Sequence, residues 1–162
     1  MISLLPFETT DYTRLIAWVG SERLLVQFAG QRFQFPLTCH QLAAHLQDPN
    51  RYVFKVFCKE RNRVVGHAEI SDCGSGKGVI CRMLIGEENL RNLGYGRMTL
   101  QALIEFARKQ LHMDQLFLNV YHWNKAAISC YQRVGFQIIP FKKRYILFNE
   151  ERWEVLRMQY IG

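Results

Sequence analysis

Two glycines and two arginines stand close together in the segment Arg91-Asn92-Leu93-Gly94-Tyr95-Gly96-Arg97. This segment follows an apolar run, Val79 to Ile85, and precedes the most regular helical pattern of the chain. A strand that passes through glycines into a helix brings free backbone N–H groups and the positive end of the helix dipole to one point. Phosphate groups bind at such points. The segment predicts a phosphate-binding junction, and an ordinary tight turn is the alternative.

Single residues argue against two nucleotide-binding motifs. A dinucleotide fingerprint would need a third glycine at position 99, where the chain has Thr99. A Walker loop needs Gly-Lys followed by Ser or Thr, whereas Gly76-Lys77 is followed by Gly78. Neither motif therefore identifies the ligand whose phosphate would bind at this junction.

A second pattern follows the helix. It contains a β-rich run with Asn119, then Asn124 at the start of a helix that includes Tyr131 and ends at Gly135-Phe136. Together with the Arg-x-x-Gly-x-Gly pattern of the first segment, in this order, it resembles the GNAT superfamily of N-acetyltransferases. The resemblance is sharp from Val79 to Phe136. Within the superfamily the chain is most similar to the branch with ribosomal-protein N-terminal alanine acetyltransferases and polyamine acetyltransferases.

The resemblance implies an acetyl-CoA-dependent enzyme that transfers an acetyl group directly to a primary amine. The amine would belong to a protein N-terminus or to a small molecule, and no metal would take part. Acetyl-CoA is expected as the cosubstrate, with its pyrophosphate on the glycine junction and its pantetheine arm along the preceding strand. The residues expected to contact it are Met83, Leu84, Ile85, Arg91, Asn92, Leu93, Gly94, Tyr95, Gly96, Arg97, Asn119 and Asn124.

Two residues are the candidates for proton transfer. The resemblance implies that Tyr131 is the general acid that protonates the leaving sulfur, although a phenol in this position could also simply fill the core. Glu69 is the candidate general base, because a partly buried carboxylate would have a raised pKa. An exposed strand glutamate is the alternative reading of Glu69. His122 or a chain of water molecules could replace it as the base.

The charge balance favours an anionic partner. Lys and Arg total 21 and Asp and Glu total 14, so the formal net charge is +7. A rival to the enzyme is a non-catalytic basic module of the same fold that holds RNA or a ribosomal partner, with the run Lys142-Lys143-Arg144 as its contact surface. It leaves the two ordered motifs unexplained, so a nucleic acid is not favoured. A basic protein also disfavours polyamines, unless Glu8, Asp11 or Glu22 makes the cleft acidic.

The chain is expected to form one N-acetyltransferase domain, 1–162, in the cytoplasm. Apolar residues make up 49% of it, which excludes a disordered chain. Its five cysteines have no C-x-x-C spacing, its first residues do not predict a signal peptide, and none of its apolar runs is long enough to span a membrane. A membrane partner is therefore not expected, while a homodimer is left open.

The periodicity predicts an α/β fold. Strands are expected at 2–7, 52–58, 64–71, 79–85, 115–121, 136–147 and 151–161, and helices at 11–19, 38–47, 96–111 and 124–134. The stretch 21–36 has no clear period. The three strands in the middle should form an antiparallel meander, and the last two a hairpin. We expect a GNAT-like three-layer α/β/α sandwich with a mixed, mostly antiparallel sheet of about seven strands.

Overall fold

The computed structural model describes residues 1–162. Its strands are β1 (Ile2–Pro6), β2 (Arg51–Cys58), β3 (Arg63–Gly74), β4 (Lys77–Ile85), β5 (Gln115–Tyr121), β6 (Phe136–Phe148) and β7 (Glu151–Tyr160). Its helices are α1 (Tyr12–Trp18), α2 (Glu22–Ala29), α3 (Cys39–His45), α4 (Tyr95–Gln110) and α5 (Lys125–Val134), with short 3-10 turns η1 (Thr9–Asp11) and η2 (Glu88–Leu90). No helix has the length and the apolar composition needed to cross a membrane.

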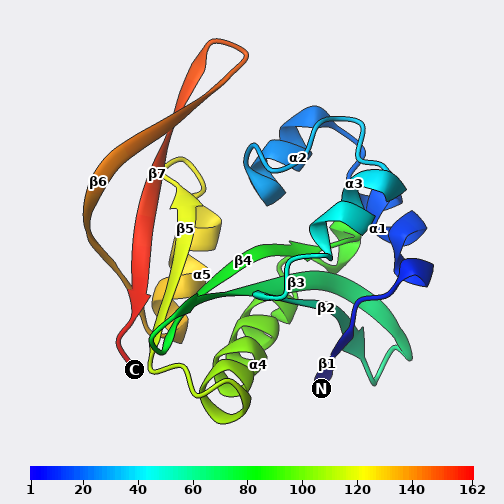
Figure 1. Ribbon diagram of the computed structural model, residues 1–162, viewed down its shortest axis with the longest axis horizontal. Coiled ribbons are helices and arrows are strands. Elements are labelled where there is room, and N and C mark those ends of the chain that lie inside the picture. The colour runs from blue at the N-terminus through cyan, green and yellow to red at the C-terminus, as the bar shows by residue number, and fades with distance from the viewer.

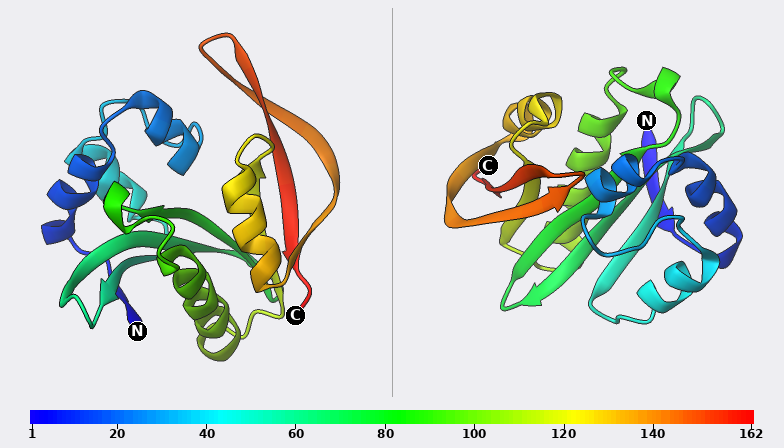
Figure 2. Two further views of the ribbon diagram at one scale, coloured as in Figure 1. Left: turned by 180° about the vertical axis from the view of Figure 1, so that it is seen from behind. Right: turned by 90° about the horizontal axis from the view of Figure 1, so that it is seen from above.

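The seven strands form one open mixed sheet in the order β1-β2-β3-β4-β5-β7-β6. All neighbours are antiparallel except β4 and β5, which confirms the predicted sandwich, the meander and the closing hairpin. Helices α1, α2 and α3 lie over one face of the sheet, and α4 and α5 over the other (Figure 1). The view from behind shows α4 and α5 side by side (Figure 2).

Two apolar clusters hold these layers together. The larger lies between the sheet and α4, and includes Leu100, Leu103 and Ala107, all fully buried on the predicted helix stripe. The smaller lies under α1, α2 and α3, and includes Leu15 and Leu25. Each helix layer is therefore fixed by its own core, one on each face of the sheet.

Helix α2 is the one regular helix that the sequence analysis did not predict. Ser21 caps it, since its Oγ accepts a hydrogen bond from the Leu24 backbone N–H at 3.1 Å. Leu25, Phe28 and Ala29 form its buried face. This helical spacing is present in the sequence, but it is short and merges with the irregular, aromatic-rich stretch that follows Gly30.

Strands β4 and β5 separate halfway along their length. Their parallel pairing runs from Lys77 only as far as Ile80, opposite Leu118. On its other side β4 has a β-bulge, because Arg82 and Met83 both lie between the pairs that Cys81 and Leu84 make with β3. Arg82 has a φ of +47°, in the left-handed region. The bulge bends β4 away and leaves backbone groups of this strand without a partner.

The β6–β7 hairpin extends beyond the rest of the sheet (Figure 1). Its turn is at Asn149-Glu150, where both residues have a positive φ. The basic run 142–144 lies within strand β6, at a shift of register between Ile139 and Arg144. The run is therefore part of a strand, as the predicted strand 136–147 implies.

Candidate functional site

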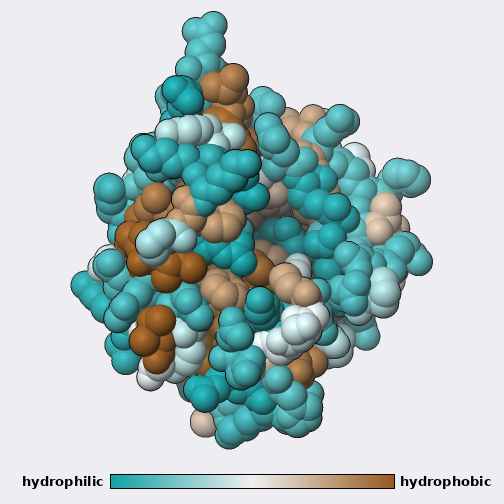
Figure 3. All heavy atoms as spheres, turned by 60° about the vertical axis from the view of Figure 1, so that its left-hand side comes forward, coloured by the Kyte–Doolittle hydropathy of each residue, from teal (hydrophilic) through white to brown (hydrophobic).

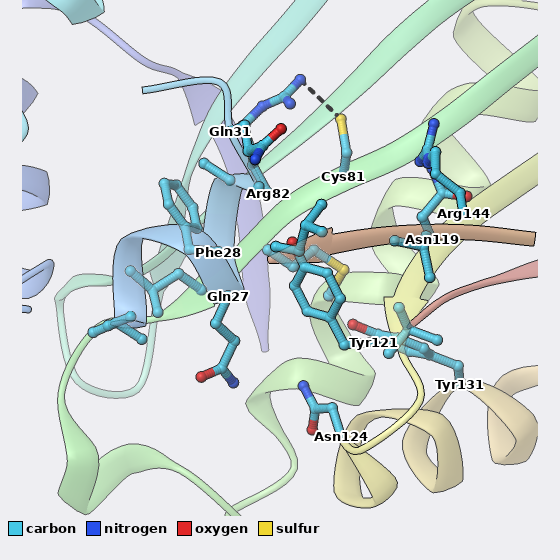
Figure 4. Close-up of a pocket in the computed structure, with 18 of the residues that line it drawn as sticks. Gln27, Phe28, Gln31, Cys81, Arg82, Asn119, Tyr121, Asn124, Tyr131 and Arg144 are labelled. Carbon is cyan, nitrogen blue, oxygen red and sulfur yellow. Dashed lines mark hydrogen bonds between the residues drawn. The ribbon is translucent and has the colours of Figure 1, made fainter. Parts of the chain in front are cut away.

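A pocket with a volume of about 480 Å³ opens where β4 and β5 separate. One side is formed by Cys81 to Leu84 and by Asn119 to Tyr121, and the other by helix α2 and the β6–β7 hairpin. Figure 3 shows the surface hollowed on this face, with mostly hydrophilic side chains around the opening. Figure 4 shows the lining side chains pointing into one space from these four directions.

Five of the residues predicted to act in the site line this pocket. They are Met83, Leu84, Asn119, Asn124 and Tyr131. The segment 91–97, Ile85 and Glu69 are not among its lining residues. The two sequence motifs that resemble the GNAT family thus lie at two places, the segment 91–97 at the start of α4 and the motif with Asn124 and Tyr131 at the pocket.

Tyr131 reaches into the pocket from helix α5 (Figure 4). The helix is fixed at its start by Asn124, whose Oδ1 accepts a hydrogen bond from the Ala127 backbone N–H at 3.3 Å. Asn124 therefore acts as the predicted N-cap and lines the pocket as well. Burial raises the pKa of Tyr131 to about 12, so its phenol keeps its proton at neutral pH.

The junction before α4 has the predicted geometry. Gly94 is the N-cap with a φ of +90°, which an L-residue adopts only with strain, and no side chain caps the helix. The first intrahelical bond is from the Met98 N–H to the Gly94 carbonyl, so the N–H groups before it have no intrahelical acceptor. No atom lies within 4 Å of where a Cβ would be on Gly94 or Gly96. The junction is accessible to an anion.

Two side chains of the junction hold the loop instead of facing outward. Arg91 donates from Nε to the Ile85 carbonyl at 3.1 Å and from Nη2 to the Gly86 carbonyl at 3.4 Å. The hydroxyl of Tyr95 accepts a hydrogen bond from Arg61 Nε at 2.7 Å. These contacts leave the backbone of the loop, more than its side chains, to meet an anion.

Glu69 occupies a sealed network and not the pocket surface. The residue is 1% exposed, and its carboxylate contacts Nε2 of His45 at 2.9 Å, Nε2 of His67 at 3.0 Å and Nε of Arg82 at 2.6 Å. Burial alone would raise its pKa, but the hydrogen bonds to the two histidines and the Arg82 charge together hold the pKa of Glu69 well below its ordinary range. The predicted rise in this pKa is therefore wrong.

The protonation of the network follows from its contacts. Arg32 donates from Nε to Nδ1 of His45 at 3.0 Å, so the His45 proton lies on Nε2 and is donated to Glu69. Burial lowers the pKa of His45, which keeps this ring neutral. The histidines and Glu69 do not form a group that could hold a metal ion. A guanidinium, from Arg82, satisfies the carboxylate instead.

His122, the other candidate base, is also engaged elsewhere. Its Nδ1 accepts a hydrogen bond from the Glu154 backbone N–H at 3.2 Å, and it is not a lining residue of the pocket. No Asp, Glu or His side chain lines the pocket.

On the side of the pocket formed by α2 and β6, Gln27, Gln31 and Arg144 were not among the predicted site residues. Gln27, Phe28 and Gln31 come from α2 and the turn after it, and Arg144 from β6. Tyr121 joins the two sides, because its hydroxyl donates to the Val26 carbonyl at 3.1 Å. The Ser21 cap and the spacing of the apolar residues after it could have revealed α2. Nothing local in the sequence indicates the position of Arg144.

An aromatic clamp also ties α2 to the sheet. The Arg23 guanidinium lies 5.1 Å from the ring centre of Trp123 and 4.9 Å from that of Trp153. Such cation–π contacts contribute about 0.5–1 kcal/mol each at exposed sites. Arg23 thereby links α2 to the segment after β5 and to β7.

Comparisons with known proteins agree with this geometry. The model of the acetyltransferase (GNAT) family matches residues 14–136. An N-acetyltransferase 9-like protein of Nematostella vectensis is 23% identical over 94% of this chain and 84% of its own length. The spermidine N-acetyltransferase of Vibrio cholerae, solved with CoA and spermine, has a TM-score of 0.82 at 16% identity, over 98% of this chain and 94% of that chain. The ribosomal-protein alanine N-acetyltransferase of Escherichia coli has a TM-score of 0.73 at 20% identity, over 99% and 93%.

Proposed function

The chain belongs to the GNAT family of acetyltransferases, and on this premise we propose that it transfers the acetyl group of acetyl-CoA directly to a primary amine. Acetyl-CoA supplies a thioester that an amine can attack. The observation that carries the proposal is the convergence of Tyr131, Asn124 and the bulged part of β4 on one pocket.

The anchor for the pyrophosphate is the junction before α4. Free N–H groups after Gly94 and the positive end of a 16-residue helix favour a multiply charged anion there. Arg91 keeps the loop in place through the carbonyls of Ile85 and Gly86. Asn92, Leu93, Tyr95, Gly96 and Arg97 act with it, mainly through their backbones.

The pantetheine arm is bound by β4 as if it were a further strand. Beyond Ile80 the backbone of β4 has no β5 partner, so Met83, Leu84 and Ile85 have groups available for such pairing. A backbone N–H of the same strand polarises the thioester carbonyl, an effect worth roughly 3 kcal/mol in comparable sites. Asn119 and Asn124 contact the arm from the opposite side.

Tyr131 is the general acid. Its pKa, raised by burial to about 12, lies well above neutral pH, so the phenol is protonated and can donate from Oη to the strongly basic thiolate that leaves. The phenol then recovers a proton from the nitrogen of the acceptor, directly or through water, since that nitrogen must lose one when the amide forms. The proton thus moves from nitrogen to sulfur with no net change in Tyr131.

The acceptor amine does not need a carboxylate base in this pocket. Arg144 lines it without a carboxylate partner, whereas Arg82 is paired with Glu69, and a positive charge close to an amine lowers the pKa of its ammonium form. Water in the opening can then accept the proton and so take the place of Glu69 or His122 as the base. We assign Glu69 the task of holding Arg82, and through it the bulge in β4.

Two measurements on the purified protein test the proposal. Acetyl-CoA at 100 times its Kd should stabilise the fold by about 2.7 kcal/mol, seen as a rise in Tm. A mixed panel of primary amines should then release free CoA thiol. The absence of a Tm shift with acetyl-CoA, together with a shift by RNA that is steeply salt-dependent, would favour the basic binding module instead.

A further inference from the structure

The pocket carries positive charge without a matching acid. Its lining residues include two arginines, Arg82 and Arg144, and no aspartate or glutamate. The acidic residues that could have served a cationic acceptor lie elsewhere. Asp11, for example, is bound by Arg14 at 2.5 Å and by Lys55 at 3.1 Å, and neither Glu8 nor Glu22 lines the pocket.

The two arginines differ in whether their guanidinium groups are already paired with a carboxylate. Arg82 already donates from Nε to the sealed carboxylate of Glu69, and its Nη2 lies 3.1 Å from the Cys81 sulfur. Arg144 forms no salt bridge with any carboxylate of the chain. It is the cation of the pocket whose charge is not offset.

The position of Arg144 is set by the irregularity in β6. Ile139 pairs with Arg157 and Arg144 pairs with Val155, so the four residues between them bulge out opposite a single residue of β7. The Arg144 charge is close enough to Tyr121 to oppose the rise in the pKa of that phenol which burial causes. In Figure 4, Arg144 lies beside Asn119, at the end of the pocket away from Asn124.

A polycation would be repelled by this arrangement. The Vibrio cholerae structure was solved with spermine, but an acceptor with several positive charges would here meet the unpaired charge of Arg144 and no carboxylate in the pocket lining, since the charge of Arg82 is already paired with Glu69. An acceptor with a negative charge would gain a charge-assisted, bidentate contact with a guanidinium.

We propose that the acceptor is a primary amine that also carries a carboxylate, which binds Arg144 while the amine lies toward Tyr131. The inference rests on the proposed function and narrows its substrate. Gln27 and Gln31 face the same space and offer neutral hydrogen bonds to the rest of the acceptor. A free α-amino acid and a peptide N-terminus followed by an acidic residue share this chemistry.

Pairs of acceptors that differ only in charge test the proposal. Alanine is compared with alaninamide, and Ala-Glu-Gly amide with Ala-Gln-Gly amide, with spermidine as the polycation. The readouts are kcat/KM from thiol release and the Tm shift that each amine gives to the CoA complex. We expect the carboxylate-bearing member of at least one pair to be preferred about tenfold. A preference within the alanine pair would indicate a free amino acid as the acceptor, and a preference within the peptide pair would indicate a peptide N-terminus.

The variant Arg144→Gln should abolish this preference, with little change in the affinity for acetyl-CoA. Its neighbour Lys143→Gln is the matched control and should keep the preference, because Lys143 does not line the pocket. Three results would overturn the inference. Both members of each pair could be used equally in both readouts, spermidine could be preferred, or the preference for the carboxylate could survive in Arg144→Gln. If acetyl-CoA itself fails to raise the Tm, the proposed function fails as well, so the two failures are distinguishable.

Discussion

The two sides of the pocket are built in different ways. The side formed by β4, β5 and α5 includes local features, such as the Asn124 cap of α5 and the bulge at Arg82 in β4. The side formed by α2 and β6 depends on contacts between distant segments, such as Tyr121 with Val26 and Arg23 with Trp153. Local features such as the Asn124 cap leave a sequence pattern and long-range contacts do not. Residues of the side that we assign to the cofactor (the cofactor side) could therefore be predicted more fully than residues of the side that we assign to the acceptor (the acceptor side).

The largest effect should come from the acid on the cofactor side. Tyr131→Phe removes one oxygen and should lower kcat about 100-fold, because the leaving sulfur then has no positioned proton donor. The Kd for acetyl-CoA, measured by calorimetry, should stay within about threefold of the wild-type value. Tyr160→Phe, a phenol that packs on Phe136 away from the pocket, is the control. An unchanged kcat in Tyr131→Phe would show that Tyr131 is not the proton donor of the reaction.

The next effect concerns the network beneath the bulge. Glu69→Gln leaves the Arg82 charge without its carboxylate and should lower the free energy of unfolding by about 3 kcal/mol at neutral pH. The pKa of Glu69 is lower in the folded protein, so this stabilisation is present above the ordinary carboxyl pKa of 4.5 and is lost as the pH falls below it.

The difference in stability between wild type and Glu69→Gln should accordingly shrink below pH 4.5 in urea titrations. Glu105→Gln, at an exposed pair with Lys109, is the matched control and should change nothing measurable. A gap that widens toward acid pH would mean that Glu69 has a raised pKa, as the sequence alone suggested.

A smaller effect is expected at the glycine junction. Gly94→Ala places an L-residue at a φ of +90°, at a cost of about 1–2 kcal/mol. The loop should relax away from the anion-binding geometry, and the Kd for acetyl-CoA should rise about tenfold. Gly20→Ala is a control with open space and no positive φ. Equal affinity in both variants would show that the junction does not bind the pyrophosphate.

The smallest effect should arise on the acceptor side. Arg23→Ala removes the two cation–π contacts of α2 and should raise the acceptor KM about two- to fivefold, with kcat and the Kd for acetyl-CoA unchanged. Lys109→Ala, on α4, controls for the lost charge. A change in the affinity for acetyl-CoA that equals the change in acceptor KM would show that the two sides do not act separately.

The same contrast explains what the sequence could predict. The helical pattern of α4 and the start of α5 at Asn124 each depend on residues close together in the chain, so both helices were predicted with nearly the observed bounds. The lowered pKa of Glu69 could not be predicted, since it depends on contacts with His45 and Arg82, which come from α3 and β4. Helix α2 was missed because its short pattern runs into an irregular segment.

A crystal structure with acetyl-CoA bound tests the central claim most directly. We predict that the pyrophosphate lies on the backbone N–H groups after Gly94 and that the thioester sulfur lies within hydrogen-bond distance of Tyr131 Oη, between β4 and β5. A thioester bound outside this opening, or a Tyr131 hydroxyl that faces away from the sulfur, would contradict the account.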